Sequence, residues 1–291
     1  VEEITGLARV MREKALHVSL PHDLTPLDTC GTGGDGSGTF NVSTAAGLVV
    51  AACGQPVAKH GNRAATSRCG SADVLEALGV KIELKPEQVA RCVQDAHFGF
   101  MFAPAYHPAM KHVGPTRREI GIRTVFNILG PLTNPAGAAY QVLGVPDASL
   151  VRKMGEALLR LGCKRALVVF GEDGMDEISL GAPTIICEVL GGQGDLREYR
   201  ITPEDMGMSR QSREAVRGGD AAFNASLLRE TLAGTRSDAY ADMVSLNAGA
   251  ALLASERVGT LAEGVKLAHE TLRSGRATQT LEAVAFLSQA A

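Results

Sequence analysis

A glycine-rich segment at residues 28–44, DTCGTGGDGSGTFNVST, constrains the fold more than any other part of the sequence. Because glycine lacks a Cβ atom, such a segment can turn its backbone N–H groups inward around an anion. An apolar helix is expected to follow at about 44–53, and its positive dipole end also favours a bound phosphate. The segment therefore predicts a phosphate-binding loop, built from five glycines within eight positions and three side-chain donors: Gly31, Gly33, Gly34, Gly36 and Gly38, with Asn41, Ser43 and Thr44.

Three other interpretations of this segment compete. The spacing Gly31-x-Gly33-x-x-Gly36 matches the dinucleotide fingerprint, which needs a βαβ setting. Seven residues separate Gly36 from the expected helix, and the preceding HDLTPLDTC is expected to make a poor buried strand. A Walker A loop is excluded because no Gly-Lys-Ser/Thr closes the glycine run. A flexible surface loop is the third alternative, and the other motifs weigh against it.

Length and composition indicate a globular protein with a substantial core. The chain has 291 residues, of which 45% are hydrophobic, and a net charge of -3, with a pI of about 6.2. This size allows one large domain, or one large and one small. The acidic balance argues against a partner that is a nucleic acid or a membrane surface, since either requires a basic footprint. The longest apolar stretch, around 45–53, is about half of a membrane span.

The cysteines and the chain start complete this picture. The six cysteines are scattered without any C-x-x-C, which is typical of a reducing compartment, and we expect the cytoplasm. No signal peptide is recognisable at the start. The chain opens without methionine inside a helical pattern, EEITGLARVMREKALHV, so we expect that further residues precede it.

Short apolar strands and helices alternate along most of the chain, which predicts an α/β fold with a mostly parallel central sheet flanked by helices. Strands are expected at 55–59, 80–84, 98–103, 140–145 and 165–170, and helices at 71–79, 86–97 and 150–161, with a β-like section at 178–201 and helices beyond it. The rhythm pauses at 104–135, a helical insertion. We expect a small helical domain from residues 1–17 plus 104–135, and a large α/β domain from residues 18–103 plus 136–291.

A second informative motif, GEDGMDE at 171–177, follows an apolar strand. Carboxylates at the carboxyl end of a parallel strand lie where open α/β sheets bind ligands. Asp176 and Glu177 suit a hard cation such as magnesium, which binds through one or two carboxylates plus substrate phosphates. A solvated acidic loop is the alternative from this motif alone. Paired with a phosphate-binding loop, the acidic pair predicts a magnesium site.

Basic and polar residues supply the remaining candidates. Lys59, in KHGNR at 59–63, can give a point charge to phosphate, and His60 and Asn62 lie on a loop that favours ligand contact. One of the insertion's arginines can bind a substrate carboxylate, unless all lie on a solvated helix face: Arg117, Arg118 and Arg123. His107 and His112 are five residues apart, which is the wrong spacing for a metal pair, so they are interpreted as lining or structural residues.

Long motifs in a fixed order resemble the anthranilate phosphoribosyltransferase family, which shares its fold with the pyrimidine nucleoside phosphorylases. They are DTCGTGGDGSGTFNVSTA, KHGNRA followed by GSADVLEALG, HPAM, RREIGIRTVFNILGPLTNP and GMDE, and they span nearly the whole chain. This chain departs from the family pattern at three positions. It has Ile120 in place of the usual leucine, Tyr106 where a histidine is frequent and Thr66 where a serine is common. The resemblance implies transfer of the 5-phosphoribosyl group from phosphoribosyl pyrophosphate (PRPP) to the amine of anthranilate, in tryptophan biosynthesis.

The resemblance also implies roles for individual residues. Anthranilate is expected to contact Gly31, Asn62 and Arg117, the last chosen by the family pattern Arg-x-x-Leu-Gly. Two Mg²⁺ ions are expected, one held by Ser43 with Glu177 and a second by Asp176 with Glu177. A homodimer is expected through the small helical domain. The residues expected to bind PRPP are Gly31, Gly34, Asp35, Thr39, Asn41, Val42, Ser43, Thr44, Lys59, His60, Gly61, Asn62, Arg63, Ala64, Ala65, Thr66, Ser67 and Ser71.

Two rival functions stay open at this point. A nucleoside phosphorylase on the same scaffold would use inorganic phosphate and would not need the acidic pair Asp176 and Glu177. A non-catalytic relative that binds nucleic acid is disfavoured by the acidic pI. For the transferase, no proton-transfer residue is expected, because the amine of anthranilate is already uncharged at neutral pH.

Overall fold

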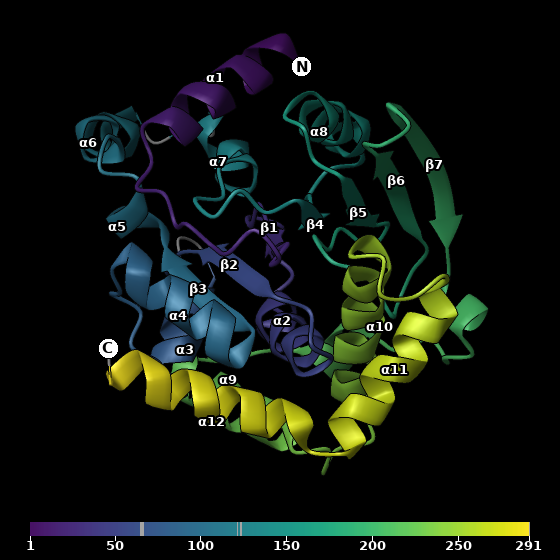
Figure 1. The fold of residues 1–291 in the computed structure, drawn as a ribbon. Helices are drawn as coiled ribbons and strands as arrows, with labels where there is room; N and C mark the ends of the chain where they lie inside the picture. Colours follow the sequence, from purple (N-terminus) through teal and green to yellow (C-terminus); the bar gives the residue numbers. More distant parts are fainter. Residues whose placement is uncertain (65–66, 121, 123, 291) are drawn as a thin grey trace.

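The computed structural model describes residues 1–64, 67–120, 122 and 124–290. Within them, seven strands form one sheet in the order β3-β2-β1-β4-β5-β6-β7 (Figure 1). The first five strands in this order are parallel, and the last two pairings are antiparallel. The prediction of an α/β fold with a mostly parallel sheet is confirmed. The strands are β1 (Leu27–Gly31), β2 (Val57–Gly61), β3 (Phe98–Phe102), β4 (Tyr140–Gly144), β5 (Arg165–Gly171), β6 (Thr184–Leu190) and β7 (Asp195–Ile201).

Helices cover both faces of the sheet. Figure 1 shows α1, α7 and α8 on one side and α2, α10, α11 and α12 on the other. Helix α2 is apolar all round because it is enclosed between the sheet and the outer helices. The helices are α1 (Glu2–Glu13), α2 (Val42–Ala52), α3 (Ser71–Ala77), α4 (Pro86–Ala96), α5 (Ala103–Tyr106), α6 (Met110–Ile120), α7 (Phe126–Leu129), α8 (Ala148–Arg160), α9 (Ala221–Leu232), α10 (Ala239–Ala254), α11 (Leu261–Arg273) and α12 (Arg276–Gln289), with 3₁₀ turns η1 (Gly130–Leu132), η2 (Pro203–Met206) and η3 (Arg213–Val216).

Strand β1 lies at the centre of the sheet, so the expectation that HDLTPLDTC makes a poor buried strand is wrong. Its polar residues are buried because they find partners: Asp28 accepts hydrogen bonds from Asn134 Nδ2 at 2.7 Å and from the backbone N of His60 at 3.2 Å. The absence of a buried strand therefore cannot be used against a dinucleotide-binding loop. The length of the loop still argues against one, since five residues separate Gly36 from the start of α2 at Val42.

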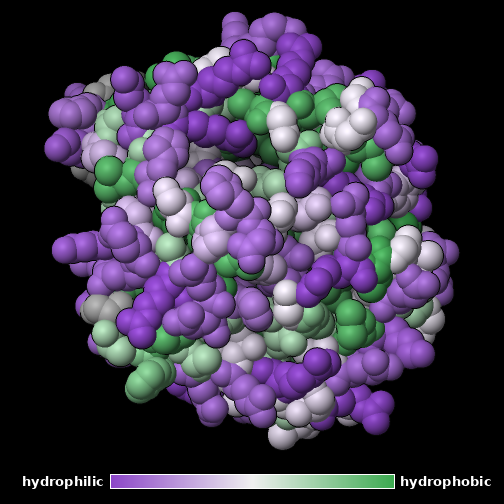
Figure 2. All heavy atoms as spheres, viewed as in Figure 1, coloured by the Kyte–Doolittle hydropathy of each residue, from purple (hydrophilic) through white to green (hydrophobic). Residues whose placement is uncertain are grey.

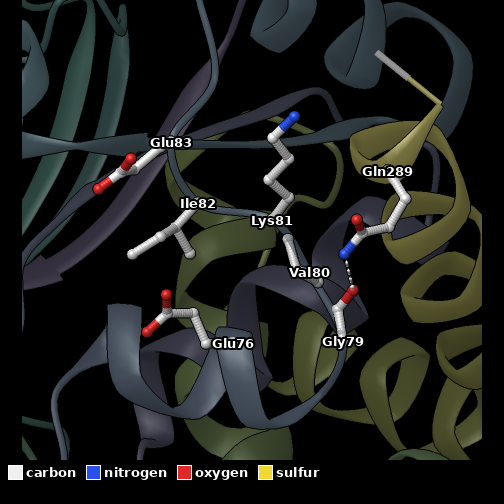
Figure 3. Close-up of a pocket in the computed structure, with 7 residues that line it drawn as sticks. All are labelled: Glu76, Gly79, Val80, Lys81, Ile82, Glu83 and Gln289. Carbon is white, nitrogen blue, oxygen red and sulfur yellow. Dashed lines mark hydrogen bonds between the residues drawn. The ribbon is translucent and has the colours of Figure 1, made fainter.

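The segment 80–84 has the alternating burial of a strand but joins no ladder among the described residues, so that strand prediction is wrong. Val80, Ile82 and Leu84 are buried, whereas the two residues between them are exposed. Helix α12 supplies one partner, since the Lys81 N–H donates to Ser288 Oγ at 3.0 Å, and the Val80 N–H donates to the Leu75 carbonyl of α3. Figure 3 shows this segment beside a hollow of about 370 Å³ next to the end of α12.

Helix α1 packs on the helical insertion and on α8 together. Ala8 is buried in a cluster with Leu129 and Leu132 of the insertion and with residues of α8. The Arg12 guanidinium donates to the carbonyl of Leu132 at 2.7 Å and to that of Leu161 at 3.2 Å. The chain start therefore contacts both the insertion and α8, and α8 belongs to the expected large domain.

Among the described residues, no helix has both the length and the apolar character that crossing a membrane requires. In the space-filling view, hydrophilic side chains cover most of the visible face and hydrophobic ones form small scattered groups (Figure 2).

Candidate active site

The glycine loop, which we define as residues 31–41, joins the carboxyl end of β1 to the N-terminus of α2. Its conformation depends on glycine: Gly33, Gly34, Gly36 and Gly38 have φ angles of 70°, 78°, 65° and 67°, a region that side chains disfavour. The loop borders a cavity of about 480 Å³. Residues of the glycine loop and the start of a helix therefore line one open space, an arrangement that suits an anion.

Four chain segments line this cavity: the glycine loop with the start of α2, residues 67–71, residues 176–177 and residues 217–219. The fold brings them together because the two loops follow β1 and β5, whose carboxyl ends lie at the same edge of the parallel sheet. The predicted site residues among the lining are Gly31, Gly34, Asp35, Thr39, Asn41, Val42, Ser43, Ser67, Ser71, Asp176 and Glu177.

The acidic loop, which we define as residues 171–178, crosses over the ends of β1 and β4. Asp176 accepts a hydrogen bond from Gly33 N at 2.9 Å and donates its own N–H to Asp35 Oδ2 at 3.4 Å. Both strands end in glycine where the loop passes. A Cβ on Gly31 would lie 2.3 Å from Asp176 Oδ2, and one on Gly144 would lie 1.6 Å from the Asp176 carbonyl. The close fit of the loop therefore depends on these two glycines.

The carboxyl groups of this loop ionise with difficulty. Burial, and then the nearby Asp35 charge, raise the pKa of Asp176 to about 7. Burial, and then Asp176, raise the pKa of Glu177 well above its usual value, while Lys59 and the Ser43 N–H oppose this rise. Crowded carboxylates of this kind are stabilised by a bound cation.

The donor set fits a hard, oxygen-binding cation. In the part of the chain that the structure describes, no three His, Cys, Asp or Glu side chains form a complete metal cage. Magnesium does not require one, since it keeps waters and binds through one or two carboxylates and substrate phosphates. Asp176, Glu177 and the Ser43 hydroxyl all face the cavity and offer oxygen only. They are the residues that would hold the ion.

Lys59 lies behind the glycine loop and does not line the cavity. It is fully buried, and its Nζ donates to the Thr29 carbonyl and, at 3.2 Å, to Ser43 Oγ. Burial lowers the pKa of Lys59, and the charge of Asp28 opposes this shift. In this structure Lys59 orients Ser43 and supplies positive charge beneath the acidic pair.

The other residues of KHGNRA also lie off the cavity, as does Thr44. The buried His60 ring contacts Gly130 O through Nδ1 at 3.2 Å and lies 5.0 Å from the ring of His107, and burial lowers its pKa to about 3. The exposed Arg63 binds the α3 carboxylates of Asp73 and Glu76 at 3.0 and 2.5 Å. Asn62 is exposed, while Gly61 and Ala64 are half-buried.

Some predicted residues lie outside what the structure describes. They are Ala65 and Thr66 of the PRPP set, together with Arg123 of the insertion. Arg117 and Arg118 belong to helix α6, but their side chains are not described.

Sequence reasoning missed a group of residues that line the cavity. Arg217, Gly218 and Gly219 line it beside Thr39 and Phe40 of the glycine loop, and Arg68 lines it beside Ser67. A signal was present, since a basic residue and a glycine pair stand just before Asp220, the N-cap of α9. The segment is about 180 residues from the glycine loop, so spacing alone could not place it there.

Comparisons with known proteins agree with this geometry. A family profile described as "Glycosyl transferase family, a/b domain" matches residues 24–278. Anthranilate phosphoribosyltransferase from Chloroflexus aggregans is 56% identical over 287 residues, which covers 99% of this chain and 84% of that protein. The chain belongs to the anthranilate phosphoribosyltransferase family.

Solved structures of the anthranilate phosphoribosyltransferase family share the fold. The crystal structure of the Thermus thermophilus enzyme aligns with a TM-score of 0.93 at 50% identity, covering 99% of this chain and 84% of that one. The Saccharomyces cerevisiae enzyme in complex with PRPP and Mg aligns with a TM-score of 0.92 at 29% identity, covering 100% of this chain and 80% of that one. The resemblance stated from the sequence motifs is confirmed.

Proposed function

We propose that this chain transfers the 5-phosphoribosyl group of PRPP to the amine of anthranilate, giving N-(5-phosphoribosyl)anthranilate and pyrophosphate in tryptophan biosynthesis. The observation that carries the proposal is the single cavity that the glycine loop and the acidic loop line together. A polyanionic donor needs both: N–H donors for its phosphates, and carboxylates that hold divalent ions against them.

The donor is assigned to this cavity. Thr39, Asn41 and Ser43 offer side-chain donors beside the glycine N–H groups, and Ser67 and Ser71 offer hydroxyls from the opposite wall. The yeast relative with PRPP and Mg supports magnesium as the cofactor. We assign one ion to Ser43 with Glu177 and a second to Asp176 with Glu177; when bound, the ions neutralise charge on the leaving pyrophosphate.

The acceptor is assigned to Asn62 and Arg117, with Gly31 close to both substrates. A guanidinium can bind the anthranilate carboxylate through two parallel hydrogen bonds, which also fixes the direction of the amine. The amine is uncharged at neutral pH, so no side chain has to remove a proton before attack. Alignment of the two reactants lowers the barrier by up to about 7–11 kcal/mol in the best cases, and one preorganised donor contributes about 3–4 kcal/mol.

The decisive experiment measures pyrophosphate release from PRPP and Mg²⁺ with and without anthranilate. We expect release only when anthranilate is present. Release of ribose 1-phosphate from a nucleoside and inorganic phosphate would instead support a nucleoside phosphorylase. Salt-dependent DNA binding without any turnover would support the non-catalytic alternative.

The acceptor assignment has its own test. Arg117→Ala should raise KM for anthranilate by about a hundredfold and leave KM for PRPP nearly unchanged, because a bidentate carboxylate pair is lost. Arg91→Ala is the matched control, since the exposed Arg91 guanidinium pairs with Asp95 on α4. Equal weakening of both substrates by Arg117→Ala would remove the assignment.

We also propose the domain division given above, a cytoplasmic location, and a homodimer through the small helical domain. Leu7 and Val10 support the dimer, because they lie three residues apart on α1 and are 39% and 54% exposed. Sedimentation should show a dimer that Leu7→Glu with Val10→Glu converts to a monomer. A wild-type monomer at micromolar concentration would contradict the proposal.

A further inference from the structure

The segment 216–220, which we call the clasp, holds residues 38–40 of the glycine loop, whereas the acidic loop contacts that loop at Gly31 and Gly33. The Phe40 N–H donates to the Val216 carbonyl at 3.3 Å, and the Gly218 N–H donates to the Gly38 carbonyl at 2.9 Å. Thr39 and Arg217 form an antiparallel bridge between the two segments. The approach is close, since a Cβ on Gly218 would lie 2.7 Å from the Phe40 backbone.

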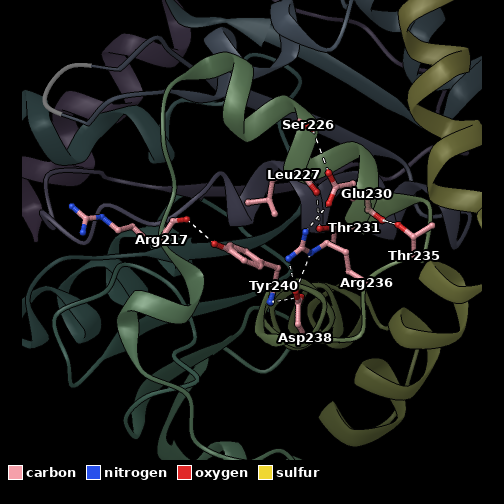
Figure 4. A network of polar contacts seen from close by, with 9 residues as sticks. All are labelled: Arg217, Ser226, Leu227, Glu230, Thr231, Thr235, Arg236, Asp238 and Tyr240. Atoms are coloured by element: carbon pink, nitrogen blue, oxygen red, sulfur yellow. Dashed lines mark hydrogen bonds and ion pairs between the residues drawn. The ribbon is translucent and has the colours of Figure 1, made fainter.

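The clasp is itself anchored by α10. Tyr240 donates its hydroxyl to the Arg217 carbonyl at 2.9 Å, and its ring meets Phe40 edge-on with centroids 5.1 Å apart. Figure 4 shows Tyr240 between Arg217 and the ion pair of Arg236 with Asp238. The Arg236 guanidinium lies 5.0 Å from the Tyr240 ring centroid. The position of the clasp is therefore set by packed, paired side chains.

A series of amide hydrogen bonds joins three of the four segments that line the cavity: the glycine loop, the clasp and residues 67–71. Asn41 Nδ2 donates to the Cys69 carbonyl at 3.1 Å, and Asn41 Oδ1 accepts from Asn224 Nδ2 at 2.9 Å. Asn224 Oδ1 in turn accepts from the Gly219 N–H at 2.8 Å. Asn224 is buried on α9, so its own side chain is shielded from water, although its partners Asn41 and Gly219 line the cavity. Its one side chain connects the glycine loop to the clasp, and through Asn41 to residues 67–71.

We propose that Asn224 is a positioning residue for the PRPP site, because its side-chain amide sets the spacing between the glycine loop and the clasp. The inference rests on the donor cavity assigned above. An amide is required, since one end must donate to Asn41 and the other must accept from Gly219. A carboxylate of the same shape would place an oxygen against Asn41 Oδ1 and lose the donor. Loss of these hydrogen bonds should weaken the binding of PRPP and not of anthranilate, because each segment that they connect lines the PRPP cavity.

The test compares Asn224→Asp with Thr231→Val. Thr231 is also buried on α9, and its hydroxyl donates to the Leu227 carbonyl within the helix, so its removal leaves the clasp intact. Asn224→Asp should raise KM for PRPP about tenfold and leave KM for anthranilate unchanged. It should also speed hydrogen exchange in peptides covering 31–41 of the ligand-free protein. Thr231→Val should change neither measurement.

Unchanged KM for PRPP together with unchanged exchange would overturn the proposal, as would equal rises in both KM values. If Asn224→Asp does not melt cooperatively, Tyr240→Phe takes its place. That variant removes one hydrogen bond to the clasp backbone and should raise KM for PRPP alone by about threefold. No rise would count against the proposal. Failure of the proposed function can be told apart from failure of this proposal. In the first case the wild-type protein releases no pyrophosphate, but hydrogen exchange at 31–41 in wild type and Asn224→Asp still tests the role of Asn224.

Discussion

The glycine loop and the acidic loop both line the cavity, but different features of the sequence determine their shapes. The glycine loop follows β1 and takes its shape from missing side chains, with four glycines at positive φ. The acidic loop follows β5 and is fixed by contacts: Asn247 accepts from the Ile178 N–H at 3.0 Å and donates to the Ile178 carbonyl at 3.1 Å. The shape of the first loop depends on the backbone freedom of glycine, and the shape of the second depends on hydrogen bonds to a neighbouring helix. A substitution should therefore have different consequences in each loop.

The largest effect is expected from removing the charges of the acidic loop. Asp176→Asn with Glu177→Gln should lower kcat/KM by at least about a thousandfold, because the ions that would neutralise the leaving pyrophosphate lose both carboxylate ligands. The melting temperature should hold or rise, since buried carboxyls are replaced by neutral amides. Glu172→Gln is the control in the same loop, where Glu172 pairs with Arg200 at 2.6 Å. Full activity in the double variant would disprove the metal assignment.

Stability should also depend on pH through this loop. The pKa of Asp176 is about 7 in the folded protein against 3.8 for an exposed group, so the folded state keeps a proton that the unfolded chain has lost. The free energy of unfolding should therefore fall as pH rises from 4 to 8, by on the order of 3 kcal/mol.

Thermal melts with EDTA can isolate this contribution. Asp28, whose pKa is raised to about 6, acts in the same direction, whereas His60, with a pKa lowered to about 3, acts in the opposite one. The difference between wild type and Asp176→Asn is therefore the quantity to follow. If the two proteins have parallel pH profiles, Asp176 does not titrate as described.

A smaller effect is expected at the strand end beneath the acidic loop. Gly144→Ala would place a Cβ 1.6 Å from the Asp176 carbonyl, so the loop must move. We expect a loss of about 2 kcal/mol in stability and a weaker response to Mg²⁺, measured by denaturant unfolding and by magnesium titration of the rate. Gly6→Ala on α1 meets nothing within 4 Å and should be stabilising, by up to about 1 kcal/mol, since alanine favours the helix interior. A Gly144→Ala enzyme that matches wild type would show that the loop is not fixed there.

The smallest effect is expected in the glycine loop. A Cβ on Gly36 meets no atom within 4 Å, so the only cost of Gly36→Ala is the backbone strain of a side chain at a φ of 65°. That strain lowers the free energy of unfolding by about 1 kcal/mol. KM for PRPP should rise about fivefold, with little change in melting temperature. Gly192→Ala, which is equally open and has ordinary φ, is the control. A large loss of stability in Gly36→Ala would remove the contrast between the two loops.

The sequence predicted the class of fold, the glycine loop and the acidic pair, because each is a local pattern. It missed β1, since Asp28 and Thr29 are buried polar residues whose partners, such as Asn134, lie far along the chain. It mistook 80–84 for a strand, because alternating burial against α12 resembles alternation in a sheet.

The candidate site shows the same difference between local and long-range features. Most of the predicted residues in the glycine and acidic motifs line the cavity. The clasp could not be predicted, because only the fold brings Arg217 beside Thr39. Lys59 was expected to face phosphate and is instead enclosed behind Ser43, an outcome decided by the register of β2 with its neighbours.

The glycines that end β1 and β4 have a consequence for how the carboxylates are placed. Because the acidic loop rests directly on two bare strand ends, the position of Asp176 is tied to the sheet itself. The distance between the acidic loop and the start of the glycine loop is thus inherited from the pairing of β1 with β4.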